Sequence, residues 1–104
     1  MAKRRSPLLL QLMARLGDVE IKEGYIPRDG GRDIYGLWTN DGTIIINPIP
    51  HTVDSVLHEL LHELKPDYNE RAVRSVVGKL MKQLSEKEVQ AIYLEYRRKV
   101  DRDL

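Results

Sequence analysis

The sequence predicts an α+β fold, in which a short twisted sheet packs on a central helix, with one helix before the sheet and two helices after the central one. Apolar residues recur at helical spacing in four segments, and two short apolar runs flank a strong turn signal. The 104 residues leave room for one modest core, so we expect a single domain over residues 1–104.

The first predicted element is an N-terminal helix. Ser6 is a suitable N-cap, Pro7 suits the first helical position, and Gly17 is a typical helix stop. One face of this helix is apolar and comprises Leu8, Leu9, Leu12, Met13 and Leu16.

The basic residues 1–5 and the leucines after them resemble a secretion signal only superficially. Gln11 and Arg15 break the apolar run, and no cleavage site of small residues follows. No segment approaches the roughly 20 apolar residues of a transmembrane helix. We therefore expect a cytoplasmic protein that does not enter a membrane.

The predicted sheet consists of one strand and a hairpin. Residues 19–22 form the first strand, and residues 24–33, which contain a pair of glycines, form a mobile loop. Residues 34–39 and 43–47 form the hairpin, because Asn40-Asp41-Gly42 between them is a strong turn signal.

The central helix follows the sheet. Pro48 and Pro50 end the last strand, and Thr52 is the predicted N-cap of the helix. Val53, Leu60 and Leu64 centre its apolar stripe, which is expected to face the core.

Two further helices are predicted in the C-terminal part. Lys65-Pro66 interrupts the helical pattern, and a second helix begins near Asp67. Ser85 and Glu88 have the spacing of a capping box and start a third helix. The apolar positions are Val73, Val76, Val77, Leu80, Met81 and Leu84 in the former, and Val89, Ile92, Tyr93, Tyr96 and Val100 in the latter. The charges of residues 97–103 predict a solvated face and a fraying end.

The composition argues against nucleic-acid binding. Seventeen basic and sixteen acidic residues leave a net charge of +1, so attraction to phosphate is weak. A nucleic-acid binder that uses residues 3–5 and 97–99 is the weakest alternative. The chain contains no cysteine, which excludes disulfides and cysteine-ligated zinc.

The segment His58-Glu59-Leu60-Leu61-His62 is the strongest functional signal. On a helix, His58 and His62 lie about 40° apart, so both imidazoles can bind one metal ion. Glu59 lies about 100° further round, where it suits a general base that takes a proton from an activated water. The spacing therefore predicts one Zn²⁺ per chain.

Zinc in such a site needs a third protein ligand. Glu70 projects within the apolar packing face of the second predicted helix, and packing of that face on the central helix brings Glu70 to the histidines. His51 is the next candidate, Asp67 the third, and Glu63 points further from the histidines. A competing interpretation is a capping box over residues 67–70, in which Glu70 only bonds the start of its helix.

The residues around the motif resemble the zincin metallopeptidases. Residues 55–64 and Asn69-Glu70-Arg71-Ala72-Val73 are most similar to the minigluzincins, a group of very small gluzincin-like proteins. The resemblance covers residues 34–84, and the spacing between the motif and Glu70 is shorter than in larger gluzincins. It implies three zinc ligands and a general base: His58, His62 and Glu70 as ligands and Glu59 as the base.

The resemblance implies zinc-dependent hydrolysis of peptide bonds in a peptide or protein substrate. It also implies that an edge of the hairpin, residues 34–39 or 43–47, pairs with the extended substrate. If the hairpin is only structural, Trp38 and Ile45 are expected to pack on the helices. The candidates for stabilising the oxyanion are Tyr68, Tyr93, Tyr96 and His51.

A second hypothesis is a zinc-stabilised interaction or regulatory module, of phage or mobile-element type, without general peptidase activity. The small size favours this module, because little of the chain remains to build specificity pockets. Glu59 favours the enzyme, since a purely structural zinc site has no need of it.

Overall fold

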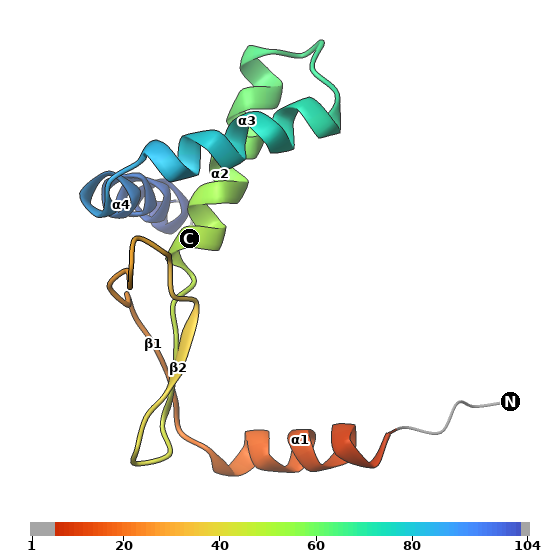
Figure 1. The fold of residues 1–104 in the computed structure, drawn as a ribbon, viewed down its shortest axis with the longest axis vertical. Helices are drawn as coiled ribbons and strands as arrows, with labels where there is room; N and C mark the ends of the chain where they lie inside the picture. Colours follow the sequence, from red (N-terminus) through yellow and green to blue (C-terminus); the bar gives the residue numbers. More distant parts are fainter. Residues whose placement is uncertain (1–5, 103–104) are drawn as a thin grey trace, which may run out of the picture.

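The computed structural model describes residues 6–102, which form four helices and a three-stranded sheet (Figure 1). In chain order the elements are α1 (Pro7–Asp18), β1 (Ile21–Glu23), β2 (Gly36–Trp38), β3 (Ile44–Ile46), α2 (Ile49–Leu64), α3 (Glu70–Gln83) and α4 (Glu86–Arg102). The α+β class predicted from the sequence is confirmed. The basic segment at residues 1–5 and the end of the charged run, residue 103, lie outside the described residues.

The sheet is mixed, with the strand order β1-β3-β2. β2 and β3 form the predicted antiparallel hairpin, in which Trp38 lies opposite Ile44. Gly42 adopts a φ of 85° in the turn between them, a conformation that glycine adopts readily. β1 pairs with β3 in parallel, with Ile21 opposite Ile44. All three strands have three residues and are shorter than predicted.

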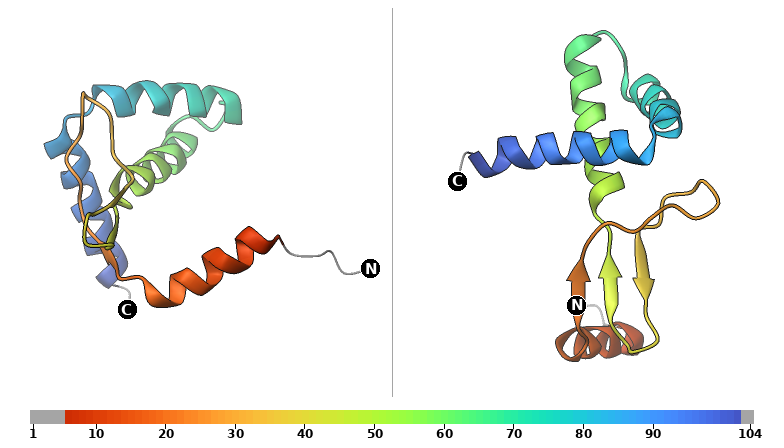
Figure 2. Two further views of the ribbon diagram at one scale, coloured as in Figure 1. Left: turned by 60° about the horizontal axis from the view of Figure 1, so that its bottom comes forward. Right: turned by 90° about the vertical axis from the view of Figure 1, so that its left-hand side faces the viewer.

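The position of the sheet differs from the prediction. Among the described elements, α2 has its close contacts with α3 and α4, and the strands have theirs with one another. Figures 1 and 2 show the sheet extending from the N-terminal end of α2 instead of packing on it. Only Asn47 and Pro48 separate β3 from α2, so the chain has too little length to turn the helix back over the strands. Trp38, which was expected to pack on the helices if the hairpin is only structural, is 76% exposed.

The core lies among α2, α3 and α4. Ile49 and Val53 of α2 pack with Val89 of α4, and the partly buried Leu57 and Ile92 surround them. In α3 the buried side chains are Val73 and Val77.

The predicted apolar stripe of α2 is only partly correct. Val53 is fully buried, but Leu60 and Leu64 are 49% and 74% exposed. Figure 2 shows the reason, because α4 crosses α2 well before its last turns and leaves the C-terminal end of α2 uncovered on that side.

The segment between β1 and β2, for which the glycines predicted a mobile loop, contacts the helices through its first residues. Ile26 is buried, and Tyr25 packs against the helical core. The backbone N–H of Arg28 donates to the Glu86 carboxylate over 2.6 Å, and the Arg28 guanidinium pairs with Asp33 over 2.8 Å. These contacts attach the segment to the start of α4.

Asn47 joins the strands to the helices. Its side chain is 1% exposed. The amide nitrogen donates to the carbonyl oxygens of Ile34 and Ile26 over 2.8 and 3.4 Å, and the amide oxygen accepts from the N–H of Ile49 over 3.3 Å. One buried side chain therefore links the segment before β2 to the first turn of α2.

The predicted helix starts are correct for α1 and α4. The Ser6 hydroxyl accepts from the N–H of Leu8, and Ser85 and Glu88 form the reciprocal bonds of a capping box. The predicted start of α2 is wrong, because the helix begins at Ile49 and Thr52 is not its cap. The two prolines at the junction are tolerated in the first turn, where N–H groups need no partner within the helix.

α1 runs away from the base of the sheet (Figures 1 and 2). None of its residues is buried. Of the helices in residues 6–102, none combines the length and the apolar character that crossing a membrane requires. The charged residues of α4 form ion pairs along its own exposed surface, as expected for a solvated face: Arg97 with Asp101, and Arg98 and Lys99 with Glu95.

Candidate metal centre

His58, His62 and Glu70 lie together where α2 and α3 meet. The Nε2 atoms of the two histidines are 3.2 Å apart. Oε1 of Glu70 is 2.6 Å from His62 Nε2, and Oε2 is 3.1 Å from His58 Nε2. The structure thus brings together the three side chains that the sequence analysis selected as ligands, and their role as ligands stays a prediction.

The connection between α2 and α3 places Glu70. The N–H of Tyr68 donates to the carbonyl of Lys65 over 3.0 Å and forms a tight turn. α3 then begins at Glu70, so its first side chain faces the last turns of α2. The short connection therefore delivers the carboxylate to both imidazoles.

The capping interpretation of Glu70 is wrong. Asn69 is the N-cap of α3, and its side-chain oxygen accepts from the N–H of Ala72 over 2.8 Å. The predicted box started at Asp67, two residues too early. With Asn69 as the cap, both carboxylate oxygens of Glu70 are free to face the histidines.

The electrostatics favour an ionised Glu70. Burial raises the pKa of its carboxyl group, but the hydrogen bond to His62 and the charges of His62 and His58 outweigh this effect. The pKa of Glu70 therefore lies below its usual value. An ionised carboxylate is the form that binds a metal.

The two imidazoles and the carboxylate fit a divalent metal ion such as zinc. Ligand atoms held 2.0–2.1 Å from a tetrahedral ion lie about 3.3 Å from one another. The spacings of 2.6–3.2 Å between the Nε2 atoms and the carboxylate oxygens are close to this value. Two histidines and one carboxylate are also a donor set of catalytic zinc sites. The Glu70 side chain is mostly exposed, which leaves one side of the group accessible from solvent.

The other candidate ligands lie elsewhere. Within residues 6–102, the group of side chains whose donor atoms could share a metal consists of His58, His62 and Glu70. His51 instead stacks on Tyr35, with ring centroids 4.4 Å apart. Asp67 and Glu63 are exposed and do not belong to the group.

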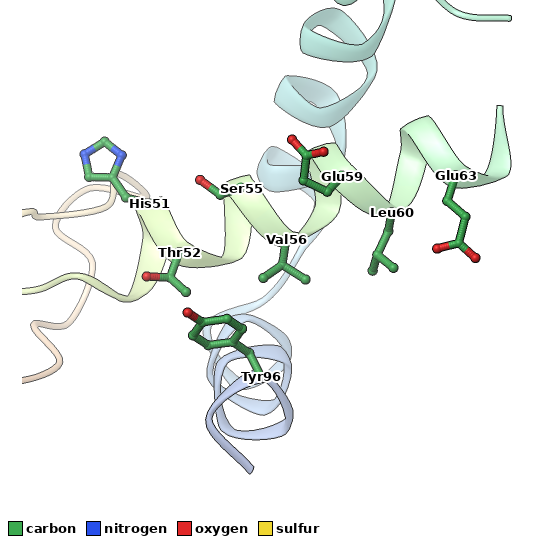
Figure 3. Close-up of a pocket in the computed structure, with 8 residues that line it drawn as sticks. All are labelled: His51, Thr52, Ser55, Val56, Glu59, Leu60, Glu63 and Tyr96. Atoms are coloured by element: carbon green, nitrogen blue, oxygen red, sulfur yellow. The ribbon is translucent and has the colours of Figure 1, made fainter. Parts of the chain in front are cut away.

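Glu59 lies between two hollows on the surface of α2. The first, which we call the α2/α4 hollow, has a volume of about 610 Å³ and includes Val56, Leu60 and Tyr96. Figure 3 shows Val56 and Leu60 on the side of α2 that faces Tyr96, and Glu59 projecting to the other side, as Ser55 does.

The second hollow, the α2/α3 hollow, lies beside the histidines. It has a volume of about 420 Å³ and is lined by Asp54, Ser55, His58, Glu59, Arg74 and Val77. Ser55 and Glu59 line both hollows. A peptide that crosses α2 at Glu59 therefore contacts the polar α2/α3 hollow on one side and the mainly apolar α2/α4 hollow on the other.

Arg74 is a site residue that the sequence analysis missed. It lies one helical turn after Glu70 on α3 and lines the hollow that contains His58 and Glu59. Within residues 6–102, no ion pair is recorded for Arg74, whereas Arg28, Arg97 and Arg98 each have one. The i, i+4 spacing from Glu70 was the signal that could have identified it.

The candidate oxyanion groups separate in the structure. Tyr96 lines the α2/α4 hollow, where Glu59 also lies. Tyr93 packs against the core, Tyr68 lies in the turn before α3, and His51 is occupied by stacking on Tyr35. Tyr96 and His51 therefore line a hollow together with Glu59, whereas Tyr93 and Tyr68 do not.

The hairpin does not take the position expected for pairing with a substrate. β3 is paired on both sides, so residues 43–47 offer no free edge. β2 has a free edge, but the sheet extends from the first turn of α2 and His62 lies in its last turn. No strand of the described chain lies beside the metal centre (Figure 2).

A comparison of the chain with models of known protein families, with curated proteins and with solved structures finds no match.

Proposed function

We propose that the chain is a zinc-dependent peptidase of the small, minigluzincin-like type. The observation that carries the proposal is the convergence of His58, His62 and Glu70 at distances that suit one metal ion, with Glu59 beside them at the meeting point of two hollows. In this proposal the substrate is a peptide or protein, and one Zn²⁺ belongs to each chain. A cytoplasmic location is part of the same proposal.

The proposed chemistry divides the work between the metal and the side chains. A bound zinc ion supplies a Lewis acid that polarises a carbonyl group and lowers the pKa of a water molecule. Glu59 accepts the proton of the attacking water and passes it to the leaving amine. Its exposed position at the border of both hollows supports this role, because a base must reach the solvent and the substrate.

Two further side chains have positions that suit catalysis. Arg74 supplies a cation in the α2/α3 hollow, where it can stabilise the negative charge that develops on the carbonyl oxygen. Leu60, Val56 and Tyr96 offer an apolar surface in the α2/α4 hollow that suits an apolar side chain of the substrate.

The zinc-stabilised interaction module remains the second candidate. The observation that favours it is the lack of a strand beside the metal centre in the described chain, because such a strand would align an extended peptide by main-chain hydrogen bonds.

The substitution Glu59→Gln separates the two candidates. The variant should bind one equivalent of zinc and unfold at an unchanged temperature, while cleavage of a diverse peptide library falls by about 100-fold or more. Glu63→Gln is the matched control, because Glu63 lies one turn further along α2 and lines only the α2/α4 hollow. Zinc-loaded wild type that cleaves no more than Glu59→Gln contradicts the peptidase and leaves the interaction module.

A further inference from the structure

α1 is an amphipathic helix that has no close contact with another helix or with a strand of the described chain. Leu8, Leu12 and Leu16 follow one another along its apolar face and are each about 60% exposed. α1 takes part in none of the close contacts between the described elements. A 12-residue helix is marginal in water by itself, so the stability of α1 requires a surface that covers its apolar face.

One face of the sheet is also largely apolar and uncovered. The register places Ile21, Ile44 and Trp38 in one row across the three strands, so their side chains point to the same side. Ile46 lies two residues after Ile44 and points to that side too, in one row with Glu23 and Gly36, so the large apolar residues of this side are Ile21, Trp38, Ile44 and Ile46. We call these four residues the sheet face. Trp38 is its most exposed member, and Ile21 and Ile46 are exposed as well.

The exposed area is large enough for a stable dimer. The chain has an accessible surface of 8676 Å², whereas a compact monomer of 12.1 kDa has about 6,000 Å². The seven residues outside the described part supply at most about 1,200 Å² of this difference of roughly 2,700 Å². The remainder exceeds the roughly 800 Å² that each partner buries in a standard interface.

The connection between α1 and β1 keeps α1 away from its own sheet. Only Val19 and Glu20 separate the two elements, and both are fixed by backbone hydrogen bonds. The N–H of Val19 donates to the carbonyl of Arg15 over 3.0 Å, and the carbonyl of Glu20 accepts from Ile44 over 2.9 Å. These bonds set the direction in which α1 leaves β1 (Figure 1).

The polar side of α1 argues against a lipid surface as the partner. Helices that lie on membranes carry several Lys or Arg residues on their polar face. α1 itself has Arg15 as its single cation, together with Gln11 and Asp18, and the cations Lys3, Arg4 and Arg5 precede it in the sequence. The chain itself provides the missing apolar surface, because the sheet face is uncovered in every copy.

We propose that two copies of the chain form a symmetric dimer, in which α1 of each copy packs on the sheet face of the other. Such an arrangement is reciprocal and closed, so it buries both uncovered surfaces of both copies at once. It is independent of the proposed peptidase activity and of zinc.

Sedimentation and the fluorescence of Trp38 test this proposal directly, because Trp38 is the single tryptophan of the chain. The full-length protein should sediment at about twice its mass of 12.1 kDa at micromolar concentrations. Trp38 emission should shift to longer wavelength on dilution, as the dimer dissociates and exposes the ring. A monomer at all accessible concentrations overturns the proposal, whether Trp38 is exposed or is covered by α1 of its own chain.

Two substitutions test the two surfaces of the proposed dimer interface separately. Leu12→Lys on α1 and Ile21→Lys on the sheet face should each raise the dimer dissociation constant by about 30-fold or more. Leu94→Lys is the control, because Leu94 is more exposed than either residue but lies on α4. Far-UV circular dichroism checks that the rest of each variant remains folded.

Mixing the two variants gives the decisive result. Leu12→Lys retains an intact sheet face and Ile21→Lys retains an intact α1, so a mixed dimer has one good contact where each homodimer has none. The mixture should therefore dimerise at concentrations where each variant alone is monomeric. A mixture that stays monomeric, or a dimer that survives Leu12→Lys unchanged, overturns the proposed pairing.

Discussion

The helical part of this molecule buries apolar residues, whereas the sheet part does not. In α2, α3 and α4, Val53, Val73 and Val89 are almost fully enclosed by neighbouring helices. In the three strands no residue is buried, and in α1 none is buried either. The helices complete their core within one chain, whereas the sheet and α1 do not. An apolar pattern in the sequence thus predicts that a surface is buried, but it does not identify whether the same chain or another molecule buries it.

The largest expected effect concerns the metal centre, which belongs to the helical part alone. Zinc at 100 times its dissociation constant should stabilise the protein by about 2.7 kcal/mol. Hydrogen exchange should show the added protection in α2 and α3 and little change in the strands, because the ligands lie on those two helices. Equal protection of the strands would contradict the separation of the two parts.

Glu70→Gln tests the same centre by substitution. The amide keeps the shape of the side chain but loses the charge that a metal prefers, so zinc affinity should fall by about 100-fold or more, as measured by competition with a chelating dye. Asp67→Ala is the matched control and should leave zinc affinity unchanged, because Asp67 does not belong to the group. Equal zinc affinity of Glu70→Gln and wild type would exclude Glu70 as a ligand.

The next prediction concerns a substitution that weakens the junction between the two parts. Asn47→Ala removes three hydrogen bonds of a buried side chain and leaves polar groups of Ile26, Ile34 and Ile49 without their partner. The free energy of unfolding in urea should fall by about 2–3 kcal/mol. The exposed Asn40→Ala should change it by less than about 0.5 kcal/mol. Similar values for the two variants would mean that the junction is not stabilised by Asn47.

A smaller effect is expected at the start of α3. Asn69→Ala removes the N-cap bond to Ala72 and should cost about 1 kcal/mol of stability in urea unfolding. Asp67→Ala serves again as the control and should cost less. A larger loss for Asp67 than for Asn69 would restore the capping box that the sequence first indicated.

The smallest effect depends on pH and lies at the start of α4. The hydrogen bond from the backbone N–H of Ser85 lowers the pKa of Glu88 in the folded protein, and the hydrogen bond with the Ser85 side chain lowers it further. The stabilisation is therefore complete above the unfolded value of about 4.5 and is lost as pH falls through the lower folded value. Glu88→Gln should reduce the difference in stability between pH 6 and pH 3. An unchanged difference would show that Glu88 does not contribute.

Local chemistry made part of the fold predictable from the sequence. The caps at Ser6 and Ser85 and the turn at Gly42 depend on residues within four positions of one another, and all three are correct. The grouping of Glu70 with the histidines was also predictable, because one short turn joins two long helices.

The remaining features depend on residues far apart in the chain. Helical periodicity placed Leu60 and Leu64 in the core, but their burial depends on where α4 crosses α2. Asn47 is an unremarkable turn residue in the sequence, and its partners are up to 21 positions away. Arg74 became a site residue only when α3 was placed against α2. Tertiary geometry decides each of these, and the i, i+4 spacing of Arg74 from Glu70 was the one local signal among them.

The direct passage from β3 into α2 makes the helix a lever. His62 lies 13 residues beyond Ile49, which is about 20 Å along the helix axis. A tilt of about 5° at the junction therefore moves the His62 end by roughly 1.7 Å relative to the strands. α3 packs on α2 and carries Glu70, so such a tilt moves the whole metal centre relative to the sheet, and Asn47 and the two prolines limit that movement from the other end of the helix.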